Sequence, residues 1–166
     1  HKGFIRDPRT TAILSFDYHD DMGRVPFLDK SSVMGYCVGQ GLVSHVAVVG
    51  AKYSMYGNGN DPENFSVILG KNVHTDGKPD REKFLTNMKR VFGKWKESGV
   101  NQMYVSVDLD GMQLDRFRYE GIDYSLPKII FEVLSLSGLT RLSFLAASHP
   151  DEAFDVYQKE FGKNLL

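Results

Sequence analysis

The chain has 166 residues, of which 42% are hydrophobic and 25% are charged, and its formal net charge is −1. This composition is typical of a folded globular domain and excludes fibrous and intrinsically disordered chains. Because 20 basic residues balance 21 acidic ones without a long basic run, and no apolar segment reaches the roughly 18 residues of a spanning helix, we expect neither nucleic acid nor a membrane as a partner.

A single cysteine, Cys37, excludes an intrachain disulfide framework. No secretory signal is recognisable and a lone thiol suits a reducing compartment, so we predict a cytoplasmic protein. Because Cys37 has no second cysteine to pair with, we interpret it as a small buried residue rather than as a nucleophile.

Apolar runs that predict strands alternate along the chain with longer patterns that predict helices. Strands are expected at residues 10–17, 44–53, 65–69, 102–111 and 139–148. Helices are expected as a short segment within 22–42 and at 78–100, 125–138 and 149–161. This alternation predicts a parallel sheet covered on both faces. We therefore predict a single α/β domain over residues 1–166, a three-layer α/β/α sandwich with a mostly parallel sheet.

The helix expected at 78–100 carries the clearest local signals. Asp80 is a suitable residue to cap its start, and Gly99 a suitable left-handed residue to end it. Between them, apolar side chains recur at helical spacing: Phe84, Leu85, Met88, Val91, Phe92 and Trp95.

Ionisable residues follow the first predicted strand in the stretch SFDYHDD, residues 15–21. Asp17, His19 and Asp21 occupy alternate positions, and alternate side chains of a strand point to the same side. Two carboxylates and an imidazole placed together repel one another and resist burial, whereas a bound cation would stabilise them.

A second acidic motif, YVSVDLDG, ends the strand predicted at 102–111 and contributes Asp108 and Asp110. Ligands of open α/β sheets bind outside the carboxyl ends of the strands, so we expect both motifs at one edge. Carboxylates with a minority of imidazole suit Mn²⁺ better than structural zinc. The alternative is that each Asp is only a cap or a turn residue.

The two motifs resemble the metal-binding signatures of the ureohydrolases, the superfamily of arginase, agmatinase and formiminoglutamase. FDYHDD is similar to the family's Asp-x-His-x-Asp motif, and SVDLDGMQLD to its Ser-x-Asp-x-Asp motif. Weaker similarity continues in the same order through the segments HVAVVGAKYSMYGNGND and YEGIDYSLPKIIFEVLSLSGLTRLSFLAASHP. The resemblance implies an arginase-like domain that lacks the N-terminal part of typical family members.

Carried over by position, the resemblance implies a site for two Mn²⁺ ions that activates a water molecule. The metal ligands it implies are Asp17, His19, Asp21, Asp108 and Asp110. Asp110 is also the implied catalytic residue, which accepts a proton from the water. The implied reaction is hydrolysis of a non-peptide C–N bond in an amidine, a guanidine or a related small molecule.

The chain departs from the family's pattern at three positions. The family's further histidine ligand follows a Gly-Gly-Asp segment, and the only candidate here is His1, without that segment. The loop at 30–40 lacks the family's histidine, and His45 lies at the head of an apolar strand, where a structural role is the alternative. Ala147 stands where the family has its substrate-binding glutamate, which makes arginine or agmatine a doubtful substrate.

Three hypotheses therefore stand. The first is a metal-dependent hydrolase of ureohydrolase-like architecture, and the second a metal-binding but non-catalytic binding or regulatory protein. The third is an α/β scaffold without metal, which elemental analysis distinguishes from the other two. Because a shortened sheet leaves an uncovered edge, we also expect a homo-oligomer.

Overall fold

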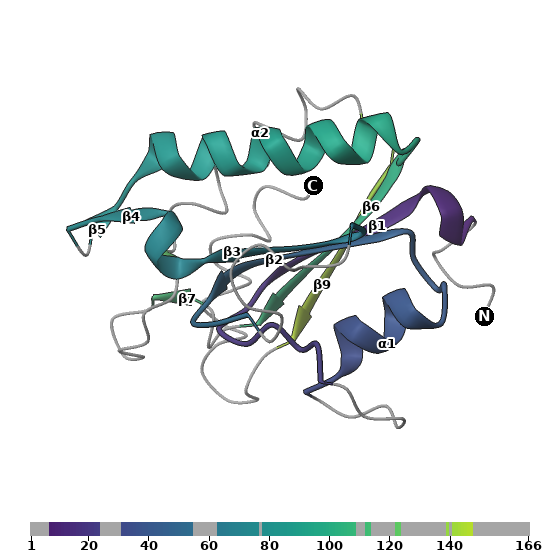
Figure 1. Cartoon of the computed structure of the whole chain (residues 1–166), viewed down its shortest axis with the longest axis horizontal. Helices are drawn as coiled ribbons and strands as arrows, with labels where there is room; N and C mark the ends of the chain where they lie inside the picture. The colour runs from purple at the N-terminus through teal and green to yellow at the C-terminus, as the bar shows by residue number, and fades with distance from the viewer. Residues whose placement is uncertain are drawn as a thin grey trace.

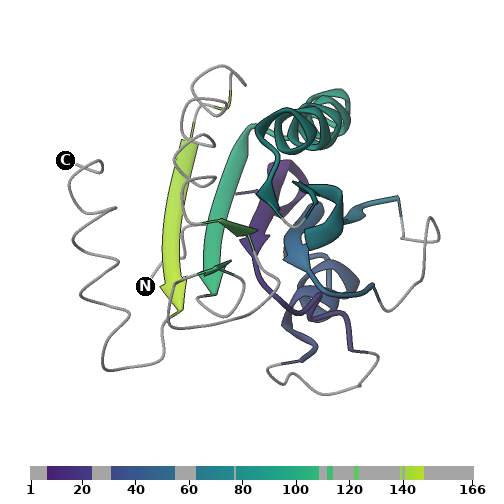
Figure 2. The same cartoon turned by 90° about the vertical axis from the view of Figure 1, so that its left-hand side faces the viewer.

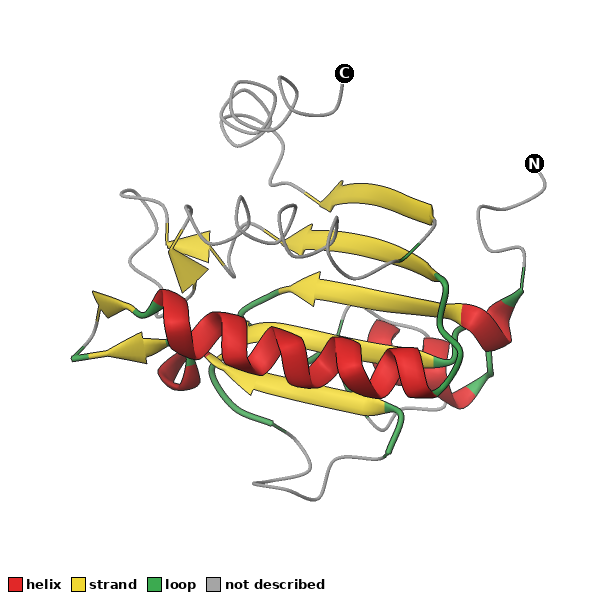
Figure 3. Cartoon of the chain, turned by 90° about the horizontal axis from the view of Figure 1, so that it is seen from above, coloured by secondary structure: helices red, strands yellow, loops and turns green. Residues whose placement is uncertain are grey.

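The computed structural model describes residues 7–23, 31–54, 63–76, 78–108, 112–113, 122–123, 139 and 141–147. These residues form an α/β fold built on a five-stranded, fully parallel sheet in the order β3-β2-β1-β6-β9. The strands are β1 (Thr11–Phe16), β2 (His45–Ala51), β3 (Phe65–Leu69), β6 (Gln102–Asp108) and β9 (Arg141–Ala147). Figure 3 shows the five arrows pointing the same way, so all the carboxyl ends meet at one edge of the sheet.

Two helices cover opposite faces of this sheet, as Figure 1 shows. α1 (Val33–Gly39) connects β1 to β2, and α2 (Arg81–Glu97) connects β3 to β6. The first connection adds a strand on one side of β1, whereas the second adds a strand on its other side. Because crossovers between parallel strands share one hand, connections in opposite directions put their helices on opposite faces.

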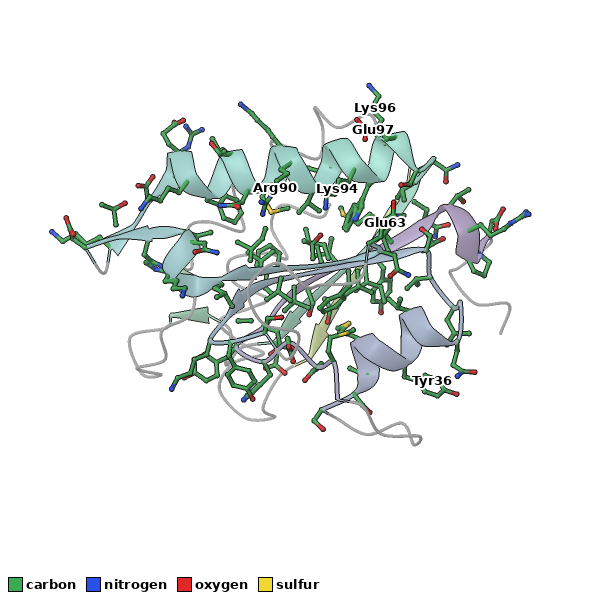
Figure 4. The ribbon with its side chains drawn as sticks, viewed as in Figure 1. Tyr36, Glu63, Arg90, Lys94, Lys96 and Glu97 are labelled. Carbon is green, nitrogen blue, oxygen red and sulfur yellow. The ribbon has the colours of Figure 1, made fainter. Side chains whose placement is uncertain are left out.

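α2 begins and ends where its sequence signals place it. The Asp80 carboxylate accepts a hydrogen bond from the Lys83 backbone N–H at 3.0 Å, which satisfies one of the first-turn donors. Gly99 follows the helix with a φ of 78°, a left-handed conformation that costs glycine little. In Figure 4, Lys96 and Glu97 lie on the side of α2 away from the sheet. The side facing the sheet buries Phe84, Met88, Val91, Phe92 and Trp95.

Successive residues of the central strands pack into two separate hydrophobic clusters, one on each face of the sheet. Ala12, Leu14 and Phe16 of β1 pack in one cluster with the buried side chains of α2. Ile13 packs in the other cluster with Met34 of α1, and Tyr104 of β6 packs against that second cluster. Odd-numbered residues of β1 and even-numbered residues of β6 therefore lie on the α1 face of the sheet.

Shorter elements complete the described part of the chain. Two of them are 3₁₀ turns, η1 (Pro8–Thr10) and η2 (Gly70–Asn72). The other four form two small sheets: β4 (His74–Thr75) with β5 (Lys78–Pro79), antiparallel, and β7 (Met112–Gln113) with β8 (Ile122–Asp123), parallel. In Figure 3 the β4–β5 pair lies beyond the carboxyl edge of the main sheet. None of these short elements follows from hydrophobic periodicity.

The parallel sheet predicted from the sequence is confirmed, and so are its strands. The third strand, 65–69, agrees in both bounds, and the others agree within a few residues at each end. β6 ends at Asp108, three residues before the end of the predicted segment. The helices expected at 125–138 and 149–161 lie outside the described residues. In the part of the chain that the structure describes, no helix is long and apolar enough to cross a membrane.

Candidate functional site

The candidate site lies where the sheet changes its direction of growth. The chain adds β2 and β3 on one side of β1, and β6 and β9 on the other. At such a switch point the connections leave the strand ends in opposite directions and open a crevice at the carboxyl edge, which is where open α/β sheets bind ligands. β1 and β6 flank this point, and Figure 2 shows them as neighbours.

The strand register brings Asp17 and Asp108 to the same level at this edge. Phe16 pairs with Val107 across β1 and β6, and each aspartate is the next residue along its own strand. The Asp17 backbone N–H also donates to the Val49 carbonyl oxygen of β2 at 3.1 Å, so the start of the loop is held against the sheet. The register therefore places Asp17 and Asp108, which come from distant parts of the sequence, at the carboxyl ends of neighbouring strands. That their side chains share a ligand stays a prediction.

Four polar residues follow one another along the α1 face toward this edge. Ser15 pairs with Ser106 in register, and Asp17 and Asp108 lie two residues further along the same strands. We call Ser15, Asp17, Ser106 and Asp108 the polar column. Ser15 is fully buried and Asp17 is 5% exposed, whereas Ser106 and Asp108 are half-buried.

Asp17 and His19 approach each other in the loop after β1. The Asp17 Oδ1 atom accepts a hydrogen bond from the His19 backbone N–H at 2.8 Å, which forms a tight turn. His19 Nδ1 lies 3.7 Å from the same oxygen, and the side chain of His19 is 49% exposed. The ring of Tyr18 packs edge-on against the His19 ring, with centroids 5.2 Å apart. His19 is therefore held next to a buried carboxylate while about half of its side chain stays exposed.

Asp21 differs from the simple alternation expected for a strand. β1 ends at Phe16, and Asp21 has a φ of 51°, a left-handed conformation that turns the chain toward α1. Its carbonyl oxygen accepts from the backbone N–H groups of Met34 and Gly35, each at 3.1 Å. The backbone carbonyl of Asp21 thus satisfies two first-turn donors of α1.

Asp20 is the acidic residue of this loop that sequence reasoning missed. It is only 3% exposed, and its Oδ1 accepts from the Met22 backbone N–H at 3.3 Å. The spacing Asp-x-His-x-Asp selects Asp21 and leaves Asp20 out, and the sequence carries no signal that singles out Asp20. The loop after β1 therefore contains a second buried aspartate besides Asp17.

Ser15 carries a buried hydroxyl that has no hydrogen-bond partner among the described residues. A buried hydroxyl without a partner costs about 1–3 kcal/mol, and such groups often mark an ordered water or an ion. Ser15 lies on the same face of the sheet as Asp17 and precedes it by two residues, so this unsatisfied hydroxyl belongs to the polar column.

The donor set fits a hard divalent cation in kind. Buried carboxylates with one imidazole suit Mn²⁺, and the unsatisfied Ser15 hydroxyl suits a site that also holds water. Within the described ranges, however, no three His, Cys, Asp or Glu side chains lie close enough to hold a metal ion. Asp110, which the sequence assigns to the site, lies outside those ranges. The predicted five-residue ligand set therefore stays a prediction.

Two further neighbours shape the edge of the site. The register pairs Asp108 with Ala147, the last residue of β9. On the other side, the Lys52 backbone N–H donates to the Tyr18 carbonyl oxygen at 2.9 Å. The Lys52 ammonium lies 5.7 Å from the centre of the Tyr18 ring, within reach of a cation–π interaction.

His45 and Cys37 lie away from the carboxyl edge. His45 begins β2 at the amino edge, where its Nδ1 lies 3.1 Å from the Ser44 Oγ atom. Burial lowers its pKa below the ordinary value of 6.5, which suits a structural role. Cys37 is half-buried within α1, and burial raises the pKa of its thiol, so it is poorly suited to act as a nucleophile.

Compared with models of known protein families, with curated proteins and with solved structures, the chain gives no match. The resemblance to ureohydrolases therefore depends on the two acidic motifs, on their order along the chain and on the chemistry that they suggest.

Proposed function

We propose that this chain is a metal-dependent hydrolase that cleaves a non-peptide C–N bond in a small molecule of the amidine or guanidine type, with two Mn²⁺ ions as cofactor. The observation that carries the proposal is the placement of Asp17 and Asp108 at one level on both sides of the switch point. We also propose that the complete chain forms a three-layer, arginase-like α/β/α sandwich, for which the helices on opposite faces are the support.

In this proposal the ligands are Asp17, His19, Asp21, Asp108 and Asp110. When bound, Mn²⁺ supplies Lewis-acid chemistry, which lowers the pKa of a bound water toward neutrality and stabilises developing negative charge. Asp110 accepts the proton of the attacking water. The backbone of the 17–23 loop positions Asp17, because both its N–H and its Oδ1 are engaged in hydrogen bonds of 3.1 Å and 2.8 Å.

The second candidate is a metal-binding protein of the same fold without catalysis. One observation favours it: Ala147 pairs with Asp108 at the position where a substrate-binding glutamate is expected. A guanidinium is recognised best by a carboxylate, which forms charge-assisted hydrogen bonds that alanine cannot make. Substrates that depend less on that contact, such as formimino compounds, are therefore the better candidates for turnover.

A turnover screen separates the two candidates. The unsubstituted protein with Mn²⁺ is incubated with guanidino, formimino and acetylamino compounds, and release of ammonia, amine or urea is measured. The hydrolase predicts metal-dependent release that Asp108→Asn abolishes. Asp76→Asn is the matched control, because Asp76 is exposed in the turn after β4 and its φ of 52° is tolerated by asparagine. Metal binding without release of any product would favour the non-catalytic protein.

A further inference from the structure

The helix α2 concentrates positive charge in a nearly neutral chain. Its 17 residues include six basic and two acidic ones, all of them exposed, whereas the whole chain has a formal net charge of −1. Lys83, Arg90 and Lys94 follow one another at intervals of seven and four residues, which places them in one stripe along the helix. We call these three residues the basic flank.

Hydrogen bonds show that this stripe lies on the side of α2 next to the end of β3. The Lys83 ammonium donates to the His74 carbonyl oxygen at 3.1 Å. Asn87, one turn further along the same stripe, donates from its side chain to the Asn72 carbonyl oxygen at 3.2 Å. Asn72 belongs to η2 and His74 to β4, the two elements that follow β3 in the chain.

Arg90 and Lys94 continue the basic flank along the helix. Arg90 donates to the Asn87 side-chain oxygen at 3.2 Å, and the Lys94 charge acts on His45, the first residue of β2. In Figure 4 both side chains lie on the side of α2 that faces the sheet, whereas Lys96 points away from it. Neither Arg90 nor Lys94 forms an ion pair in the part of the chain that the structure describes. Two exposed cations thus lie next to the sheet without an acidic partner there.

The strand beside the basic flank, β3, is the last strand on its side of the described sheet. The Val46 N–H of β2 donates to the Asn64 carbonyl oxygen at 2.9 Å, and the register then directs the backbone groups of Ser66 and Ile68 to β2. The N–H and C=O of Val67, between them, point outward. Because Val67 is only half-buried, the outer edge of β3 offers main-chain groups for pairing with another strand.

We propose that the outer edge of β3 and the basic flank together form a docking site for an extended acidic segment of a partner protein. The segment adds a strand beside Val67 through main-chain hydrogen bonds and directs its carboxylates to Arg90 and Lys94. Alternate residues of a strand are about 6.6 Å apart, and residues four apart on a helix are separated by about 6 Å along its axis. The segment that fits therefore carries acidic residues at alternate positions. This surface is independent of the proposed metal site.

Charge favours this occupant over a second copy of the chain. Pairing of β3 with β3 of another copy about a two-fold axis would bring the two basic flanks together on one face of the joined sheet, where like charges repel. An acidic strand brings the opposite charge to the same place. The alternative is that the cations only prevent pairing at this edge, as lysines at natural sheet edges do, and in that case no strand binds.

The experiment measures the fluorescence anisotropy of a labelled peptide that alternates glutamate with valine, titrated with the full chain. We expect saturable binding that weakens as the ionic strength rises. The double variant Arg90→Gln, Lys94→Gln should weaken binding about tenfold, because two charge pairs are lost. Its matched control is the double variant Lys89→Gln, Lys96→Gln, which removes the same charge from the other flank of α2. The control should change the affinity less than about twofold.

A further variant tests the edge of β3 itself. Val67→Pro removes the outward N–H and leaves the ladder to β2 intact, which is how edge strands accept proline. It should weaken peptide binding in a protein that still unfolds cooperatively. The proposal is overturned if the peptide does not bind, if both double variants lose affinity equally, or if a single-stranded oligonucleotide binds as tightly as the peptide. A fall in sedimentation mass from dimer to monomer on Val67→Pro would also overturn it, because the edge would then belong to a second copy.

Discussion

The two faces of the same central strands are built differently. On the α2 face, Leu14 of β1 pairs with Val105 of β6, and Phe16 of β1 and Met103 of β6 belong to the same cluster; all four are apolar and at most 2% exposed. We call them the apolar column. On the α1 face, the polar column replaces apolar side chains with two serines and then with two aspartates toward the carboxyl edge.

The apolar column holds the fold together, whereas we propose that the polar column serves a ligand. The apolar column packs in one cluster with the buried side chains of α2, so it contributes the burial that stabilises the sheet. The polar column reduces that burial on the α1 face and brings carboxylates together. We therefore interpret the polar column as part of the proposed binding site, because proteins break such local rules mainly at functional sites.

The largest expected effect comes from the apolar column. Leu14 is fully buried, and Leu14→Ala should lower the free energy of unfolding by about 2–5 kcal/mol, because it removes buried methyl groups and leaves a cavity. Urea denaturation measures the change. Leu42→Ala is the control, since Leu42 is 44% exposed and its truncation should stay within about 0.5 kcal/mol. Equal effects at the two positions would contradict the assignment of Leu14 to the core.

A smaller effect is expected from the polar column. A substitution there should change the stabilisation by metal without destabilising the metal-free protein. Asp108→Asn should abolish the stabilisation that Mn²⁺ provides, about 2.7 kcal/mol at a hundredfold excess over the dissociation constant. In EDTA the same variant should melt at the same or a higher temperature, because one of two neighbouring carboxylates has lost its charge. Melts with and without Mn²⁺ give both numbers. Asp108→Asn that retains the full metal-dependent shift would remove Asp108 from the site.

The N-terminal cap of α2, Asp80, is expected to make the stability of the protein depend on pH in the acidic range. A hydrogen bond from the Thr75 hydroxyl and a second from the Lys83 backbone N–H lower the Asp80 pKa below 3.8. The ionised carboxylate therefore stabilises the native state above 3.8, and this contribution is lost as the pH falls through the lowered pKa. Asp80→Ala should lower the melting temperature by a few degrees at neutral pH, and the difference should shrink as the pH falls below 3.8. A difference independent of pH would contradict this origin.

The smallest effect is expected at the amino edge, far from the carboxylates. Burial lowers the pKa of His45, the Glu63 carboxylate opposes that shift, and the Lys94 ammonium adds to it. Figure 4 shows Glu63 and Lys94 at this end of the molecule. Because the native state resists protonation, stability is unaffected above about 6.5 and falls as the pH drops below it. His45→Gln should reduce the loss of melting temperature between about pH 7 and pH 5. An unchanged pH profile would show that His45 is not its source.

The strands of the sheet were predictable because each is a run of β-branched and other apolar residues with turn residues on both sides. The strand order was not, since only tertiary packing decides that β6 joins β1 on the side away from β2. The position of Asp17 and Asp108 at one edge of the sheet could be predicted from one physical rule, that parallel strands end at a common edge. The position of Asp21 relative to them could not be read from alternation, because β1 ends at Phe16 and Asp21 follows in the loop with a φ of 51°. Its role as a ligand stays a prediction.

The burial of individual side chains in the candidate site could not be predicted from the sequence either. A serine inside an apolar strand is ordinary by composition, and only the structure shows that the Ser15 hydroxyl is buried without a partner among the described residues. Likewise, Asp20 and Asp21 are equivalent in composition, and the structure buries Asp20 to 3% exposure. Patterns in a single sequence indicate the faces and the ends of helices and strands. The burial of one side chain depends instead on what packs over it in the folded protein.

The most direct test of the metal site is a thermal melt of the unsubstituted protein in EDTA and after addition of excess Mn²⁺. We predict that the melting temperature rises with Mn²⁺ concentration, because the cation binds the folded state and relieves the repulsion between Asp17 and Asp108. Identical melting temperatures in EDTA and in excess Mn²⁺, Zn²⁺ or Co²⁺ would contradict the metal site, and the proposed hydrolase with it.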